Sequence, residues 1–158
     1  MSEELDDTYK VFADLPEIGT IPPNIIPTSQ RPDIVILSQT KREIKIVELS
    51  VPFEMNIETR HVQKCNKYAP LVNDIVNQGY NCQLICLEGG SRGYISKGNK
   101  TRLKTLLTKM KMGRQFRTTM HQISKLAVIS SYSIFCAKDE PTWMNVSTLS
   151  IPQSLYCN

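Results

Sequence analysis

Two short apolar runs in the first third of the chain constrain its fold more than any other feature. Both are rich in Ile, Val and Leu, and a polar turn at 39–42 separates them, so we predict two buried strands at about 32–38 and 43–51. Asp33 lies in the first run and Glu48 in the second. Carboxylates are rarely buried without a partner. Two of them on neighbouring core strands therefore predict a pocket for a divalent cation.

The remaining pattern favours a mixed α/β (α+β) domain with one central mixed sheet flanked by helices. We expect a short strand at 11–15, an irregular proline-rich connector at 19–30, a helix from about 57 to 77, a strand at 80–87, a glycine turn at 88–93, and basic helices at 97–112 and 115–137. We expect the helix at 57–77 to be capped by Asn56 and Gly79 and to be kinked or loosened at Pro70. We divide the chain into a disordered N-terminus at 1–10, a domain at 11–140 and a tail at 141–158. The sequence has no GxGxxG, P-loop or Gly-x-Ser-x-Gly motif.

The helix predicted at 57–77 carries its apolar residues at helical spacing. We expect this stripe to face the sheet; its members are Ile57, His61, Cys65, Tyr68, Val72, Ile75 and Val76.

Composition excludes several classes of protein. The 158 residues are enough for one domain with a real core, and the apolar content of 41% is ordinary for a globular protein. No apolar run reaches the roughly 18 residues of a membrane span, and the acidic N-terminus does not resemble a secretory signal. The cysteines form no CxxC pair, so we expect reduced, buried thiols and no zinc site beside two isolated histidines; they are Cys65, Cys82, Cys86, Cys136 and Cys157.

Charge is divided unevenly along the chain. Residues 89–138 contain eleven basic residues and no Asp or Glu, whereas the remainder has a net charge of −7. Such a basic segment suggests a polyanionic partner, and solvated helix faces are the alternative. As nucleic-acid-binding residues we select Arg92, Lys97, Lys100, Arg102 and Lys104.

The carboxylate pair suggests a specific chemistry. Hydrolysis of a phosphodiester needs a metal that lowers the pKa of water from about 15.7 towards neutrality. Mg²⁺ or Mn²⁺ suits oxygen ligands, so we assign the metal to Asp33, Glu48 and the backbone carbonyl of Leu49.

A nearby lysine would complete such a site. Ser50, two residues after Glu48, cannot supply it. At 100° per residue, Lys64 lies at the edge of the apolar stripe of the predicted helix, whereas Lys67 points away from it. We therefore select Lys64 as the catalytic lysine, with Lys67 and Tyr68 as secondary candidates.

Several short patches, taken in order, resemble the PD-(D/E)xK (restriction-enzyme-like) nuclease superfamily. More narrowly, they resemble the C-terminal endonuclease domains of non-LTR retrotransposon polyproteins. The patches are Val11–Pro16, Thr20–Pro23, Arg31–Val35, Val47–Glu54, Lys64–Tyr68 and Gly90–Gly93, followed by Ser130–Tyr132 and Trp143. The resemblance implies a restriction-endonuclease-like core with extra C-terminal helices, metal carboxylates at Asp33 and Glu48, and a catalytic lysine that has moved from the strand to Lys64.

Simpler alternatives remain for each of these residues. Asp33 would be an acid at a strand start, and Glu48 a buried acid paired with Lys45 or Lys64. Lys64 would then be a helix-edge lysine with a buried stem.

Five further residues have structural interpretations. We expect His61 to be a core histidine with its hydrogen bonds satisfied, and Glu54 and Asp14 to have surface or capping roles. Ser91 and Arg92 form either a backbone nest for phosphate or a plain turn.

Three functions remain open at this point. The first is a Mg²⁺- or Mn²⁺-dependent DNA endonuclease, the second a binding module on the same fold without turnover, and the third a relic of a mobile element. The expected substrate is DNA, with RNA as the alternative, and a dimer is left open. An intracellular, nuclear location follows from a DNA substrate alone, and we expect no membrane partner.

Overall fold

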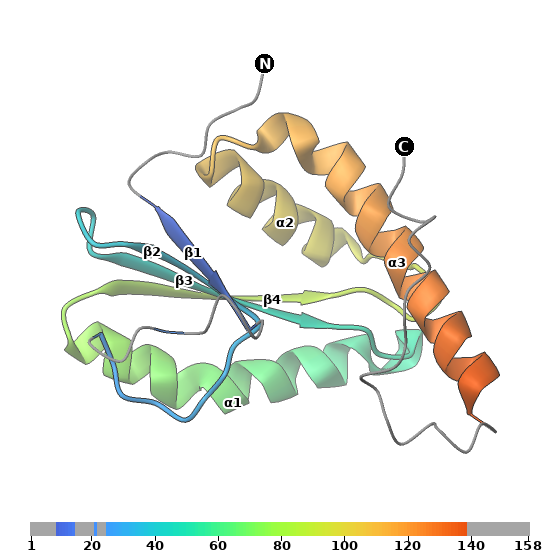
Figure 1. Ribbon diagram of the computed structural model, residues 1–158, viewed down its shortest axis with the longest axis horizontal. Coiled ribbons are helices and arrows are strands. Elements are labelled where there is room, and N and C mark those ends of the chain that lie inside the picture. Colours follow the sequence, from blue (N-terminus) through green and yellow to red (C-terminus); the bar gives the residue numbers. More distant parts are fainter. Residues whose placement is uncertain (1–8, 15–20, 22–24, 139–158) are drawn as a thin grey trace.

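A four-stranded mixed sheet lies between helices on both of its faces (Figure 1). The computed structural model describes residues 9–14, 21 and 25–138. The elements are β1 (Lys10–Ala13), β2 (Ile34–Ser38), β3 (Glu43–Ser50), α1 (Ile57–Asn77), β4 (Asn81–Glu88), α2 (Lys97–Lys109) and α3 (Phe116–Ala137), with single 3₁₀ turns at Glu54–Asn56 and Gly113–Gln115. The predicted mixed α/β class is confirmed. The predicted disordered N-terminus, apart from residues 9 and 10, and the tail at 141–158 lie outside the described residues.

The strands follow their chain order across the sheet. β1, β2 and β3 are antiparallel neighbours, whereas β4 pairs parallel with β3. A parallel neighbour requires a crossover, and α1 supplies it. The register pairs Ile34 with Val47 and Glu48 with Cys86. The start of β2, the end of β3 and the end of β4 therefore lie at the same end of the sheet.

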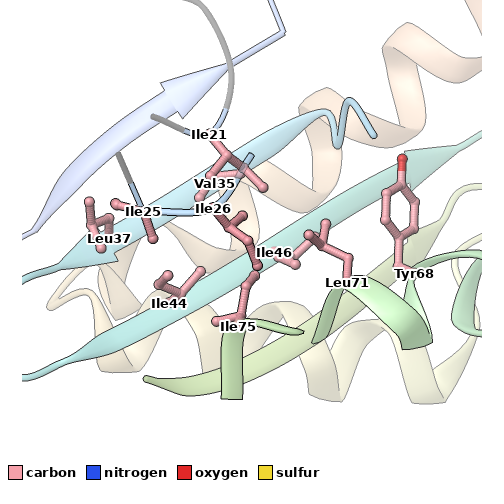
Figure 2. Packing of buried hydrophobic residues seen from close by; sticks show 10 residues of the cluster. All are labelled: Ile21, Ile25, Ile26, Val35, Leu37, Ile44, Ile46, Tyr68, Leu71 and Ile75. Carbon is pink, nitrogen blue, oxygen red and sulfur yellow. The ribbon is translucent and has the colours of Figure 1, made fainter. Parts of the chain in front are cut away.

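The face of the sheet covered by α1 holds one half of the core. Figure 2 shows Tyr68 at one end of this cluster; its buried members are Ile21, Ile25, Ile26, Val35, Leu37, Ile44, Ile46, Tyr68, Leu71 and Ile75. Tyr68 and Ile75 of the predicted stripe are buried against the sheet, but the prediction is wrong for Val76, because half of its surface is exposed. One residue along a helix turns the side chain by about 100°, so Val76 points away once Ile75 faces the sheet.

The opposite face of the sheet is covered by α2 and α3 (Figure 1). Ile36, Val47, Ile85 and Leu87 pack there against apolar residues at helical spacing, which are Leu103, Leu106 and Leu107 of α2 and Met110 directly after it. The Ser96 side chain accepts the Asn99 N–H at 3.2 Å and so caps the start of α2. Among the described helices, none is long and apolar enough to cross a membrane.

The ends of α1 follow the sequence signals only in part. Gly79 adopts a left-handed φ of +81° just after the helix, where glycine is favoured, and its N–H donates to the Val76 carbonyl at 2.8 Å. Asn56 precedes the helix but makes no capping bond through its side chain. Pro70 lies inside α1, exposed to solvent, and the helix continues through it.

Candidate active site

Asp33 and Glu48 meet where β2 begins and β3 ends. Asp33 directly precedes β2, and the antiparallel register places it beside the end of β3. Its Oδ2 accepts the Leu49 N–H at 2.6 Å, while Glu48 Oε2 accepts the Asp33 N–H at 3.2 Å. Each carboxylate is thus fixed by the backbone of the other's strand.

Lys64 of α1 reaches the same point. Its Nζ forms an ion pair with Glu48 Oε1. The Glu48 side chain is only 2% exposed and that of Lys64 25%, so the charge of Glu48 is balanced within the protein. Lys45, the other partner considered for Glu48, lies on the opposite face of β3 and pairs with Glu43 at 2.5 Å. Strand alternation explains this, because residues 45 and 48 point to opposite faces.

Tyr68 lies one turn beyond Lys64 and is fully buried. Its hydroxyl donates to the Arg31 carbonyl at 3.1 Å and accepts from Lys67 Nζ at 2.9 Å. Lys67 is exposed, and its amine folds back over the Tyr68 ring, 4.5 Å from the centroid, rather than pointing away. Burial, followed by the negative charge of Glu48, raises the pKa of Tyr68 well above its ordinary value. Tyr68 therefore remains a neutral hydrogen-bond donor.

A shallow, open depression at the sheet edge exposes part of this site. Asp33, Leu49, Ser50 and Asp14 line it. The Asp14 carboxylate is held by Arg31 at 2.6 Å. In the described part of the chain, no hydrogen bond engages Asp33 Oδ1. That oxygen, the Glu48 carboxylate and the Leu49 carbonyl are all hard donors, so the residues fit Mg²⁺ or Mn²⁺.

Glu88 is a residue of this region that the sequence interpretation missed. We assigned it to the glycine turn at 88–93, which is wrong, since it is the last residue of β4 and only 2% exposed. Its carboxylate forms hydrogen bonds with His61 Nδ1 at 2.9 Å and with the Arg102 guanidinium at 3.2 Å. The signal was present: Cys86 and Glu88 continue the period-2 series of β4 that faces α1.

The glycine turn does not present its backbone to a phosphate. The Arg92 N–H donates to Glu54 Oε1 at 2.8 Å, and the Ser91 N–H donates to the Pro52 carbonyl at 2.9 Å. Glu54 also pairs with the Arg92 guanidinium at 2.9 Å. Of the two interpretations, the plain turn therefore holds, and Glu54 serves to fix it.

The basic residues selected for nucleic-acid binding divide into two groups. Arg92 and Arg102 are held by Glu54 and Glu88, respectively. The other three are exposed along one side of α2 and make no ion pair within the described residues; they are Lys97, Lys100 and Lys104. Lys100 also lines a groove between α2 and α3, together with Arg117, His121 and Ser124.

Comparison with known proteins adds no relative to this picture. A scan against protein-family models and searches of curated proteins and of solved structures each returned no match.

Proposed function

We propose that this protein is a Mg²⁺- or Mn²⁺-dependent DNA endonuclease of the PD-(D/E)xK type, related to those of non-LTR retrotransposons. One observation carries the proposal: a lysine from the crossover helix reaches a buried glutamate beside an aspartate of the neighbouring strand. The βαβ crossover brings the ammonium group of Lys64 to the two carboxylates, at the open end of the central strands. Phosphodiester hydrolysis needs this combination of charges.

Asp33, Glu48 and the Leu49 carbonyl would hold the metal. When bound, the ion would polarise a phosphoryl oxygen and lower the pKa of a water molecule. Glu48 is positioned for this role because the Asp33 N–H and Lys64 fix both of its oxygens. Asp33 lines the open depression, where a phosphate can approach.

Lys64 supplies the third element of the chemistry. A lysine ammonium carries three donors, and Glu48 occupies one of them. The others can orient the attacking water or hold a non-bridging phosphoryl oxygen as its negative charge grows. Tyr68 keeps this part of α1 in place through its bond to the Arg31 carbonyl, two residues before Asp33.

The exposed lysines of α2 and the groove with Arg117 would bind the phosphate backbone. Contacts of this kind are independent of sequence and depend on salt. They contribute affinity for DNA without selecting a sequence, so this surface suits an enzyme that is directed to its cleavage site by other means.

The test is nicking of supercoiled plasmid by the full chain, with Mg²⁺, with Mn²⁺ and with EDTA. We expect metal-dependent nicking that is lost in Asp33→Asn, Glu48→Gln and Lys64→Ala. Asp74→Asn, which changes an exposed acid of α1, is the matched control and should retain activity. Retention in Lys64→Ala with loss in Lys67→Ala would transfer the catalytic role to Lys67.

A binding domain without turnover is the second candidate. The Glu48–Lys64 ion pair favours it, because the pair already neutralises one metal carboxylate, and Ser50 replaces the strand lysine of the motif. Salt-dependent DNA binding without cleavage in either metal would select this function and overturn the nuclease proposal.

A further inference from the structure

A second group of donor atoms lies on the α1 face, next to the carboxylate site. His61 and Cys65 are one helical turn apart on α1, and Cys86 approaches them from β4. Cys65 Sγ lies 3.7 Å from His61 Nε2 and 3.8 Å from Cys86 Sγ. One donor atom from each residue lies within 4.8 Å of the other two. We propose that His61, Cys65 and Cys86 bind a zinc-class divalent ion, and that Glu88 positions the histidine.

The two separations from Cys65 match the edges of a tetrahedral zinc site. With Zn–S near 2.3 Å and Zn–N near 2.05 Å, tetrahedral angles give about 3.8 Å between two sulfurs and about 3.6 Å between sulfur and nitrogen. The two separations that involve Cys65, 3.8 and 3.7 Å, lie close to these values, and the third, between His61 and Cys86, is within 4.8 Å. Thiolate and imidazole are borderline-soft ligands, so this site selects zinc-like ions, whereas the oxygen ligands at Asp33 and Glu48 select Mg²⁺ or Mn²⁺.

Glu88 gives His61 the orientation that a metal ligand needs. Its Oε1 lies 2.9 Å from His61 Nδ1, so a proton on Nδ1 donates to Glu88 and leaves the Nε2 lone pair facing Cys65. Carboxylates that bond the outer nitrogen of a ligand histidine are a regular feature of zinc sites. Arg102 balances the buried charge of Glu88 from the other side. The carboxylate thus serves as a positioning residue.

Three protein ligands suit a site whose fourth position is open to water or another ligand. The alternative use of the two thiols is a disulfide. The four cysteines of the described chain are free, and the Cys65–Cys86 separation of 3.8 Å is well above a bonded S–S length of about 2.05 Å. These ligands are distinct from Asp33 and Glu48, so zinc binding does not depend on nuclease activity.

The test is titration of the reduced, full-length protein with Co²⁺, followed by Zn²⁺. We expect one equivalent of Co²⁺ to give thiolate-to-cobalt charge-transfer absorption and the intense visible bands of tetrahedral cobalt, and Zn²⁺ to remove both. Cys65→Ser and Cys86→Ser should lose the charge-transfer bands or weaken them strongly. Cys82→Ser, on the same strand and outside the cluster, and Asp33→Asn, in the carboxylate site, should retain them.

Glu88→Gln tests the positioning role separately. We expect all the cobalt bands to form but the affinity to fall about 10- to 100-fold, as for other partners of ligand histidines. Alkylation followed by mass spectrometry gives a readout that does not depend on the variants: bound Zn²⁺ should protect Cys65 and Cys86 in the wild type. Absence of charge-transfer bands in the reduced wild type, unprotected thiols, or bands that Mg²⁺ displaces would each overturn the proposal.

Discussion

Removing the cation from the Glu48–Lys64 pair should destabilise the protein measurably. Lys64→Met keeps most of the aliphatic stem but leaves a carboxylate that is 2% exposed, still bonded to the Asp33 N–H and without its cation. Breaking a buried ion pair costs about 3–5 kcal/mol. Because the Lys64 side chain is one-quarter exposed, solvent screens part of the interaction, and we expect a loss of about 2–3 kcal/mol in the free energy of unfolding.

A double-mutant cycle isolates this interaction. Glu48→Gln keeps an acceptor for the Asp33 N–H and removes the charge, so the double variant with Lys64→Met places two neutral side chains in contact. Replacing both charges is often nearly neutral, so we expect the double variant to lie within about 1 kcal/mol of the wild type. The two single substitutions should then be non-additive by at least about 1 kcal/mol.

Urea denaturation of the four proteins, without divalent metal, measures these values. Lys67→Met is the matched control and should cost less than about 1 kcal/mol, since this lysine is exposed. Additive single substitutions, or a Lys64→Met variant as stable as the wild type, would refute the view that Lys64 neutralises a buried charge.

Three further measurements test other parts of the structure. Ile46→Ala should lower the free energy of unfolding in urea by about 2–5 kcal/mol, because Ile46 is fully buried, whereas the half-exposed Val76→Ala should cost less than about 1 kcal/mol; equal losses would contradict the assigned core. Burial acts to raise the pKa of Glu43, but bonds from Lys45 and Tyr9 outweigh it and hold the pKa below the ordinary 4.5. A lowered pKa means that the ionised Glu43 stabilises the folded protein above pH 4.5 and that this contribution is lost as pH falls through the folded pKa. The difference in free energy of unfolding between the wild type and Glu43→Gln, measured in urea, should therefore shrink below about pH 4.5, and a constant difference would refute this. The assigned DNA-binding surface of α2 consists of Lys97, Lys100 and Lys104. In fluorescence anisotropy with duplex DNA, replacing any one of them with alanine should lower the slope of log K against log salt by about one. Arg92→Ala should change the slope little, because Glu54 holds Arg92, and equal effects would oppose the assigned surface.

Local pattern was sufficient to predict most of the secondary structure. The apolar runs define β2 and β3 to within two residues, and the 100° periodicity of α1 puts Tyr68 and Ile75 towards the sheet. The same periodicity put Lys64 at the edge of that face, where the structure pairs it with Glu48. These predictions succeed because period and spacing within one element fix which side chains share a face.

Contacts between elements needed the tertiary structure. Glu88 and His61 are 27 residues apart, and Cys65 and Cys86 are 21 apart. No repeat, motif or spacing marks either pair. They meet because the parallel register of β3 and β4, together with the crossover helix, brings the end of β4 next to the first turns of α1 (Figure 1).

The sequence alone thus determined the mixed α/β class and the two carboxylates that begin and end neighbouring strands. Which cation balances Glu48, and which donors gather around Cys86, depended on strand register and helix placement. A one-residue shift in register would turn every side chain of a strand to the other face, so these choices exist only in the folded chain.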